Sequence, residues 1–213
     1  MKRAFRAMGT QIEVVADPTT DPTSFVAAVA AVEAIFEREE SRFSRFRSDS
    51  ELSRVNRSAG HWTDVSSPFA AVVAIALDGA ERTGGLFDPT VLPALEAAGY
   101  DRDFATIEPR DRDVPITAVP CGGWMDIELH DGRIRLPEEI GLDLGGLAKG
   151  WTADLAAAAL VAAGSRWAIV DAGATSGWLA MRLRRRSGSK TRRIGARSSA
   201  SFVSRTARSP RRP

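Results

Sequence analysis

Apolar residues recur along this chain with the period of a helix in two long stretches. From Phe25 to about Phe43 the large apolar side chains are three and four residues apart, which predicts a helix with one buried face. Thr23 or Ser24 is the expected N-cap, because a hydroxyl can bond the free N–H groups of the first turn. The same spacing over residues 67–82 predicts a second helix, which the Gly-Gly pair at residues 84–85 ends.

Shorter stretches carry the pattern of β-strands. Residues 11–16 form a run rich in β-branched side chains that ends at an Asp-Pro turn, and residues 167–170 form a second apolar run. Residues 125–129 and 133–136 alternate apolar and polar side chains on either side of His-Asp-Gly, and Asp-Gly favours a tight hairpin turn. The sequence thus predicts a hairpin and two further strands.

The remaining segments connect these elements. The polar segment 44–51 is expected to form an ordered loop, and the charged segment 101–114 a surface loop. An alanine-rich helix follows residues 143–150 and ends at Gly164. A strand, a run of helices, a hairpin, and then a helix and a strand predict an α+β layered fold rather than a doubly wound parallel sheet.

Charge divides the chain at one point. The whole sequence has 29 Lys and Arg against 27 Asp and Glu, but residues 173–213 hold 12 of the basic residues and none of the acidic ones. Residues 1–172 therefore carry a net charge of −10 and the rest carries +12. This break predicts a folded domain over residues 1–173 and a basic, disordered tail over residues 174–213. The tail could bind phosphates non-specifically, but it carries no recognition motif for a specific nucleic acid.

Composition excludes several classes of protein and of site. Cys121 is the single cysteine, which excludes an internal disulfide and a cysteine-based metal site. His61 and His130 fall in predicted turns, so we expect both to be exposed, and a hard cation such as Mg²⁺ is the metal that the composition allows. No apolar run reaches the roughly 20 residues of a membrane span, and no secretion signal opens the sequence, which predicts a cytoplasmic protein without a transmembrane segment.

Three glycine-containing turns are candidates for ligand binding. Residues 143–150, Asp-Leu-Gly-Gly-Leu-Ala-Lys-Gly, enter a helix whose N-terminus would favour phosphate, and Lys149 adds a positive charge. The segment matches neither the P-loop nor the dinucleotide fingerprint, and a capped helix start explains it equally well. For residues 84–90 a turn and helix cap is the default interpretation, and contact with a planar ligand is the alternative. Met8, before the first strand, is typical of core packing.

Five short segments, in order along residues 8–173, carry the motifs of one known family. They are Met-Gly-Thr at residues 8–10, Ser-Arg-Phe-Arg-Ser-Asp-Ser-Glu-Leu-Ser-Arg-Val-Asn at 44–56, Gly-Leu-Phe-Asp-Pro-Thr-Val at 85–91, Leu-Asp-Leu-Gly-Gly-Leu-Ala-Lys-Gly at 142–150 and Val-Asp-Ala-Gly at 170–173. Together they resemble the ApbE family, the Mg²⁺-dependent FAD:protein FMN transferases. No single segment identifies the family, whereas five at family-like separations are specific.

The resemblance implies an activity, its ligands and a set of residues. Family members cleave the pyrophosphate of FAD and attach the FMN half to a Thr or Ser hydroxyl of an acceptor protein, and they are often exported. Asp143 and Lys149 would lie near the ribose and phosphates of FAD, and the carbonyl of Gly146 would ligate Mg²⁺. The residues implied to hold FAD are Met8, Phe46, Leu86, Phe87, Asp88, Asp143 and Lys149.

The sequence departs from the family after Gly173. The family continues with Gly-Asp and a strand, and later supplies a His, an Asp-Pro-x-Thr-Gly segment and further Asp and Thr cation ligands, none of which follows Gly173 here. A shifted frame through the codons of residues 173–176 can encode Gly-Asp followed by Leu or Val. We therefore expect a frameshift at this point, an incomplete domain and impaired transfer, with the catalytic residue unknown.

Two other functions fit the same residues. A catalytically inactive module would bind FAD or phosphate without transferring a group. A nucleic-acid-associated protein would use the basic tail, and its binding would fall steeply with salt.

Overall fold

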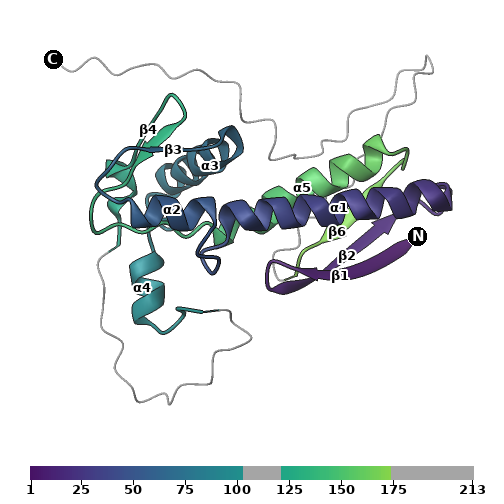
Figure 1. Cartoon of the computed structure of the whole chain (residues 1–213), viewed down its shortest axis with the longest axis horizontal. Helices are drawn as coiled ribbons and strands as arrows, with labels where there is room; N and C mark the ends of the chain where they lie inside the picture. The colour runs from purple at the N-terminus through teal and green to yellow at the C-terminus, as the bar shows by residue number, and fades with distance from the viewer. Residues whose placement is uncertain (103–120, 174–213) are drawn as a thin grey trace. The chain divides into compact units, whose positions relative to one another are not determined.

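The computed structural model describes residues 1–102 and 121–173 of the chain. Within these ranges three strands form an antiparallel sheet in the order β1-β2-β6 (Figure 1). The strands are β1 (Lys2–Ala7), β2 (Thr10–Ala16) and β6 (Ala168–Asp171). In the central strand, β2, every second residue from Ile12 to Ala16 is buried, which is the pattern expected of a strand with one face on a core.

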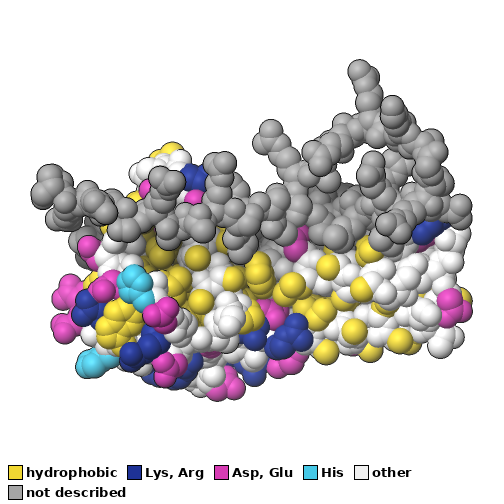
Figure 2. Space-filling model, turned by 90° about the horizontal axis from the view of Figure 1, so that it is seen from above, with side chains coloured by type: hydrophobic (Ala, Val, Ile, Leu, Met, Phe, Trp, Pro, Cys, Tyr) yellow, Lys and Arg dark blue, Asp and Glu magenta, His cyan; other side chains and the backbone are white. Residues whose placement is uncertain are grey.

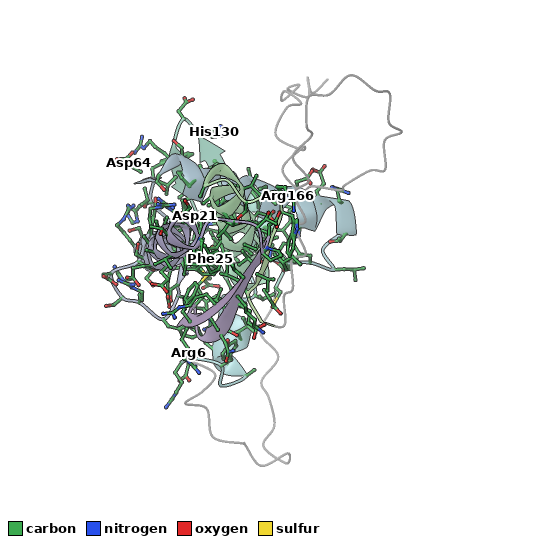
Figure 3. All side chains as sticks on the ribbon, turned by 90° about the vertical axis from the view of Figure 1, so that its right-hand side faces the viewer. Arg6, Asp21, Phe25, Asp64, His130 and Arg166 are labelled. Atoms are coloured by element: carbon green, nitrogen blue, oxygen red, sulfur yellow. The ribbon has the colours of Figure 1, made fainter. Side chains whose placement is uncertain are left out.

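Two long helices pack against this sheet, α1 (Pro22–Phe43) and α5 (Gly145–Ala162). They also pack on each other, and the small side chains of α5, such as Ala156 and Ala157, are fully buried between them and the sheet. Phe25 of α1, labelled in Figure 3, belongs to the same buried cluster. The first core therefore lies between one face of the sheet and the two helices.

A second core is built around a smaller antiparallel sheet in the order β3-β5-β4. The elements of this region are α2 (Glu51–Arg57), β3 (Thr63–Asp64), α3 (Ser67–Thr83), α4 (Leu92–Ala97), the 3₁₀ helix η2 (Gly123–Asp126), β4 (Glu128–His130) and β5 (Arg133–Arg135). Phe43 at the end of α1 and Ala148 near the start of α5 belong to this second core. The two long helices thus extend from the first core to the second, and α5 begins at the second.

The helices agree with the periodicity of the sequence, and the first helix cap does not. α1 and α3 occur where they are expected, and Gly84 ends α3 in the left-handed conformation. The prediction of Thr23 or Ser24 as the N-cap of α1 is wrong. Asp21 is the cap, because its carboxylate accepts the Ser24 N–H and Pro22 supplies the first helical residue.

The strands agree with the sequence less closely. Asp131 and Gly132 both have positive φ, as the predicted hairpin turn requires, but the strand expected over residues 125–129 covers only Glu128–His130, after η2. The sequence did not predict β1 or α2. β1 is an edge strand with four of its six residues exposed, so it has little apolar alternation, and α2 begins at Glu51, the last residue of the segment interpreted as a loop.

The fold is the α+β layered arrangement that the order of elements predicts, with antiparallel sheets. Both histidines lie at the surface, as expected; Figure 2 shows them at the left, and Figure 3 labels His130. Among the described residues no helix is long and apolar enough to cross a membrane. The basic tail over residues 174–213 and most of the predicted loop over 101–114 lie outside the described residues.

Candidate nucleotide site at the start of α5

The segment that leads into α5 alternates between buried and partly exposed residues. Leu142 and Leu144 are buried in the second core, which places Asp143 between them on the opposite side of the chain. The Asp143 carboxylate accepts the N–H of Gly145 through Oδ1 at 2.8 Å. Asp143 therefore binds the first N–H of α5 from the residue before the N-cap, Leu144, which makes no side-chain capping bond, while Gly145 and Gly146 remain exposed.

Asn56, the last residue of the second motif, binds the residue before Asp143. Its side-chain amide donates from Nδ2 to the carbonyl of Leu142 and accepts the Leu142 N–H at Oδ1, both at 2.9 Å. This pair of bonds has the pattern of an antiparallel strand pair, although one partner is a side chain. It fixes the end of α2 to the start of α5, 86 residues away along the chain.

The segment around residues 85–91 meets the same point. The N–H of Asp143 donates to the carbonyl of Pro89 at 2.9 Å, and a Cβ added to Gly146 would come within 3.3 Å of the Phe87 ring. A glycine at residue 146 thus leaves room for this ring beside the first turn of α5. Leu86, next to Phe87, is 94% exposed.

Asp88 adopts the structural role that its sequence predicts. Its Oδ1 accepts both the N–H and the hydroxyl of Thr90, at 2.7 and 2.5 Å, in a turn closed by side-chain bonds. The expectation of a helix cap is not confirmed at this residue, because Val91 precedes α4 and no side chain caps that helix. Asp88 therefore shapes the turn that places Pro89 against Asp143.

Arg45 adds a positive charge that the sequence did not single out. Its Nε lies 2.8 Å from Oδ2 of Asp143, and its guanidinium carbon lies 4.4 Å from the centre of the Phe46 ring and 4.3 Å from that of Tyr100. Phe46 itself is 43% exposed. Sequence reasoning missed Arg45, Asn56 and Tyr100 as site residues; Arg45 and Asn56 lie inside a quoted motif, whereas Tyr100 has no local signal.

Met8 forms its hydrogen bond with a residue outside this group. It forms the β1–β2 turn with φ of 49°, and its N–H donates to Oε2 of Glu40 at 3.0 Å. Because a short connection joins α5 to β6, the start of α5 and the end of β6 point to the same end of the first sheet. The β1–β2 turn lies at that end too, since β2 pairs with β6 in antiparallel register. The fold thus brings Met8 to the same end of the sheet.

Lys149 and Gly146 both lie near the start of α5 and neither is buried. Lys149 lies about one turn into α5, is partly exposed, and forms no ion pair with any described residue. Residues 1–102 and 121–173 contain no group of three carboxylate, His or Cys side chains that could hold a metal ion.

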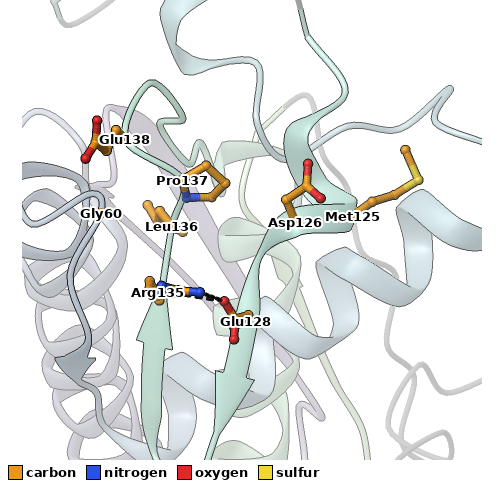
Figure 4. A pocket seen from close by; sticks show the side chains of 8 residues that line it. All are labelled: Gly60, Met125, Asp126, Glu128, Arg135, Leu136, Pro137 and Glu138. Atoms are coloured by element: carbon orange, nitrogen blue, oxygen red, sulfur yellow. Dashed lines mark hydrogen bonds and ion pairs between the residues drawn. The ribbon is translucent and has the colours of Figure 1, made fainter.

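A hollow of about 570 Å³ lies elsewhere, beside β4 and β5 (Figure 4). Arg135 and Glu128, two of the residues that line it, form an ion pair. None of the residues implied to hold FAD lines it, and the sequence did not predict it. The residues that line it are Gly60, Met125, Asp126, Glu128, Arg135, Leu136, Pro137 and Glu138.

Comparisons with known proteins point to one family. The sequence model of the ApbE family matches residues 8–196. A curated FAD:protein FMN transferase of Rhodobacter capsulatus is 35% identical over 118 residues, which are 54% of this chain and 22% of that protein.

Solved structures support the fold. An ApbE protein of Thermotoga maritima has a TM-score of 0.67 and 23% identity, over 81% of this chain and 56% of that one. A flavin transferase ApbE of Vibrio cholerae has the same TM-score and identity, over 81% and 57%. This chain spans about a fifth of the curated relative and a little over half of each solved chain.

Proposed function

Because the chain belongs to the ApbE family, we propose that it is a flavin transferase, which binds FAD at the start of α5 and moves FMN to a Thr or Ser hydroxyl of an acceptor protein. In this reaction the hydroxyl oxygen bonds to the phosphorus of the FMN half, the pyrophosphate bond breaks, AMP leaves, and the hydroxyl proton is released. The curated relative bears the name of this activity.

One structural observation carries the proposal. Three motif segments that are far apart in the sequence meet at Asp143: the Asn56 amide binds Leu142, the Pro89 carbonyl binds the Asp143 N–H, and Arg45 pairs with the Asp143 carboxylate. Gly145 and Gly146 are exposed at the helix start and Lys149 lies one turn later; a helix N-terminus and a cation both attract phosphate groups, although the Gly145 N–H is already bound by Asp143.

Each implied residue then has a distinct task in holding FAD. Lys149 would neutralise charge on the pyrophosphate, and Asp143 would accept hydrogen bonds from ribose hydroxyls. Phe46 and Leu86, which are exposed apolar side chains, would cover flat parts of the ligand. Phe87 would pack beside the first turn of α5, and Met8, in the β1–β2 turn, would contact the ligand from the other side of the site.

Mg²⁺ belongs to this proposal as a ligand of the pyrophosphate. The described residues offer one main-chain carbonyl, that of Gly146, and no cluster of side-chain ligands, so the remaining oxygen atoms would have to come largely from the phosphates. We assign no step of the reaction to the cation.

We further propose that this chain transfers FMN poorly. Residues 174–213 contain no His and no Asp-Pro-x-Thr-Gly segment, the features from which the resemblance implies a general base and side-chain cation ligands. The same observation favours a second candidate function, a module that binds FAD without transferring it.

The test measures binding and transfer separately on the full chain. Titration with FAD, with quenching of flavin fluorescence as the readout, should show saturable binding. The Lys149→Ala variant should bind roughly tenfold more weakly, because loss of one charge-assisted contact costs about 1.5 kcal/mol. Lys2→Ala is the matched control, since Lys2 lies on β1 and pairs with Glu13.

Transfer is measured by covalent flavin on an acceptor domain with one Thr, with and without Mg²⁺. Binding without labelling would support the inactive module, and robust labelling would overturn the claim of impairment. Absence of FAD binding by the folded chain, or equal binding by the Lys149 and Lys2 variants, would contradict the proposed site.

A further inference from the structure

Arg45 is buried at a position where an arginine is costly. Its side chain is 7% exposed and that of Asp143 is 13% exposed, so the pair is largely removed from water. One terminal nitrogen of Arg45, Nη2, is buried and has no hydrogen-bond partner among the described residues. A charged group that is buried with an unsatisfied donor opposes folding unless other contacts offset it.

The contacts of the guanidinium join three parts of the chain. Its Nε pairs with Asp143 before α5, and its carbon lies within 4.5 Å of the centres of two aromatic rings, Phe46 in the loop after α1 and Tyr100 after α4. The two ring centres are 5.7 Å apart and the rings are tilted by 53°. A cation at this distance from a ring is attracted by it, so Arg45 holds the carboxylate and both rings around one charge.

Stability alone does not account for this arrangement. Well-packed apolar side chains of similar volume commonly replace a buried ion pair without loss of stability. A fixed carboxylate, in contrast, is useful to a binding site, because a ligand then does not have to order it.

We propose that Arg45 is a positioning residue of the FAD site, which holds the Asp143 carboxylate and the Phe46 and Tyr100 rings in the geometry that binds the nucleotide. The inference rests on the proposed function, since it concerns the same site. Arg45 acts through Asp143 and the rings.

A double-mutant cycle on the full chain tests the inference, with the dissociation constant of FAD and the thermal midpoint as its two readouts. Arg45→Met should raise the dissociation constant at least tenfold. Asp143→Asn should raise it by a similar or larger factor, and the double variant should lose less than the sum of the two single losses, because Arg45 acts partly through that carboxylate and partly through the two rings. Arg45→Lys should retain the fold and bind with an intermediate constant.

Arg47→Met is the matched control. Arg47 lies two residues away and pairs with Glu37 and Asp49, so its loss removes the same charge without touching Asp143. We expect its FAD binding to match that of the wild type. One outcome is that Arg45→Met lowers the thermal midpoint while both Arg45→Met and Arg45→Lys bind FAD as the wild type does. In that case Arg45 has only a structural role, and this inference is overturned while the proposed function stands. Additive losses in the cycle would also overturn it. A wild-type chain that does not bind FAD would overturn the proposed function together with this inference.

Discussion

Asn56 shows how a single side chain can replace a strand partner. Its amide satisfies both the N–H and the carbonyl of Leu142, which is buried. Only Asn or Gln offers a donor and an acceptor in this planar arrangement, and Asn is short enough to act from the end of a helix. The residue therefore determines where Asp143 lies, without itself being part of the proposed contact with FAD.

We predict that Asn56→Asp lowers the free energy of unfolding by about 2 kcal/mol. Aspartate keeps an acceptor for the Leu142 N–H but removes the donor, which leaves the buried Leu142 carbonyl unsatisfied beside a carboxylate oxygen. Urea unfolding measures the change. Asn56→Ala, which removes both bonds without adding a charge, is the companion variant, and stability within 0.5 kcal/mol of the wild type for Asn56→Asp would contradict the assignment.

Asp17 makes the fold sensitive to acid. Its side chain is 1% exposed, and hydrogen bonds from Arg166 and from Thr19 hold the pKa of its carboxyl well below the ordinary value of 3.8. Asp17 follows β2 and Arg166 precedes β6, and Figure 3 labels the arginine. The ionised form is therefore favoured by folding, so the stability that it adds is present above about pH 4 and is lost as the pH falls towards the folded pKa.

The corresponding prediction concerns the slope of stability against pH. Thermal midpoints of the wild type should fall progressively below pH 4, and Asp17→Asn should start lower at pH 7 but change less between pH 4 and pH 2.5. Asp78→Asn serves as the control, because Asp78 pairs with Arg82 on the exposed surface of α3. Parallel curves for the wild type and Asp17→Asn would show that another group dominates the acid response.

At the scale of the elements, one carboxylate joins the N-terminal ends of α2 and α3. Ser66 caps α3 by accepting the Phe69 N–H, and Glu51 of α2 accepts both the N–H of Ser66, at 2.5 Å, and its hydroxyl, at 2.8 Å. Arg42, at the end of α1, lies 3.6 Å from the same carboxylate. The three helices therefore meet at the Glu51 carboxylate, which holds α2 in place although it has only seven residues.

We predict that Glu51→Ala lowers the free energy of unfolding by about 2 kcal/mol, and Ser66→Ala by about 1 kcal/mol. The double variant should lose less than the sum, because each single change already breaks the bonds between the two side chains. Denaturant unfolding of the four proteins measures the coupling. Strict additivity would mean that the two residues stabilise the helices independently.

Elements with a strong local signal could be predicted from the sequence, and elements that depend on tertiary contacts could not. α1 and α3 have a complete apolar face, and the Asp131-Gly132 turn requires its own residues. β1 is an exposed edge strand that exists because β2 pairs with it, and α2 is a short polar helix held by Glu51 and Asn56. Neither has a pattern that distinguishes it from a loop.

The proposed site divides in the same way. Glycine-rich turns marked Asp143, Gly146 and Phe87 in the sequence, because a helix start and a tight turn have local motifs. Tyr100 belongs to the proposed site because its ring and the Phe46 ring both contact the guanidinium of Arg45. Tyr100 and Phe46 are 54 positions apart along the chain, and no local pattern predicts such a contact.

At the scale of the whole molecule, α1 and α5 connect two cores, and the proposed site lies where α5 begins, at the second core. The last residue of the first core is Ala172, next to the point where the acidic part of the sequence ends and the basic part begins. The family match, however, continues to residue 196. The boundary at residue 173 therefore stays a prediction, and it has direct consequences for stability.

If residues 174–213 are out of frame, their removal should change neither the thermal midpoint nor the dissociation constant of FAD. We compare the full chain with a chain that ends at residue 173, and with a control that ends at residue 165. The control lacks β6, whose Val170 and Ala168 are buried beside β2, so it should not fold. A lower midpoint for the chain ending at residue 173 would show that the basic segment supports the domain, and would contradict a frameshift at that point.

The nucleotide sequence tests the same idea independently, since a shifted frame after the codon of Gly173 should encode Gly-Asp, then a His and an Asp-Pro-x-Thr-Gly segment.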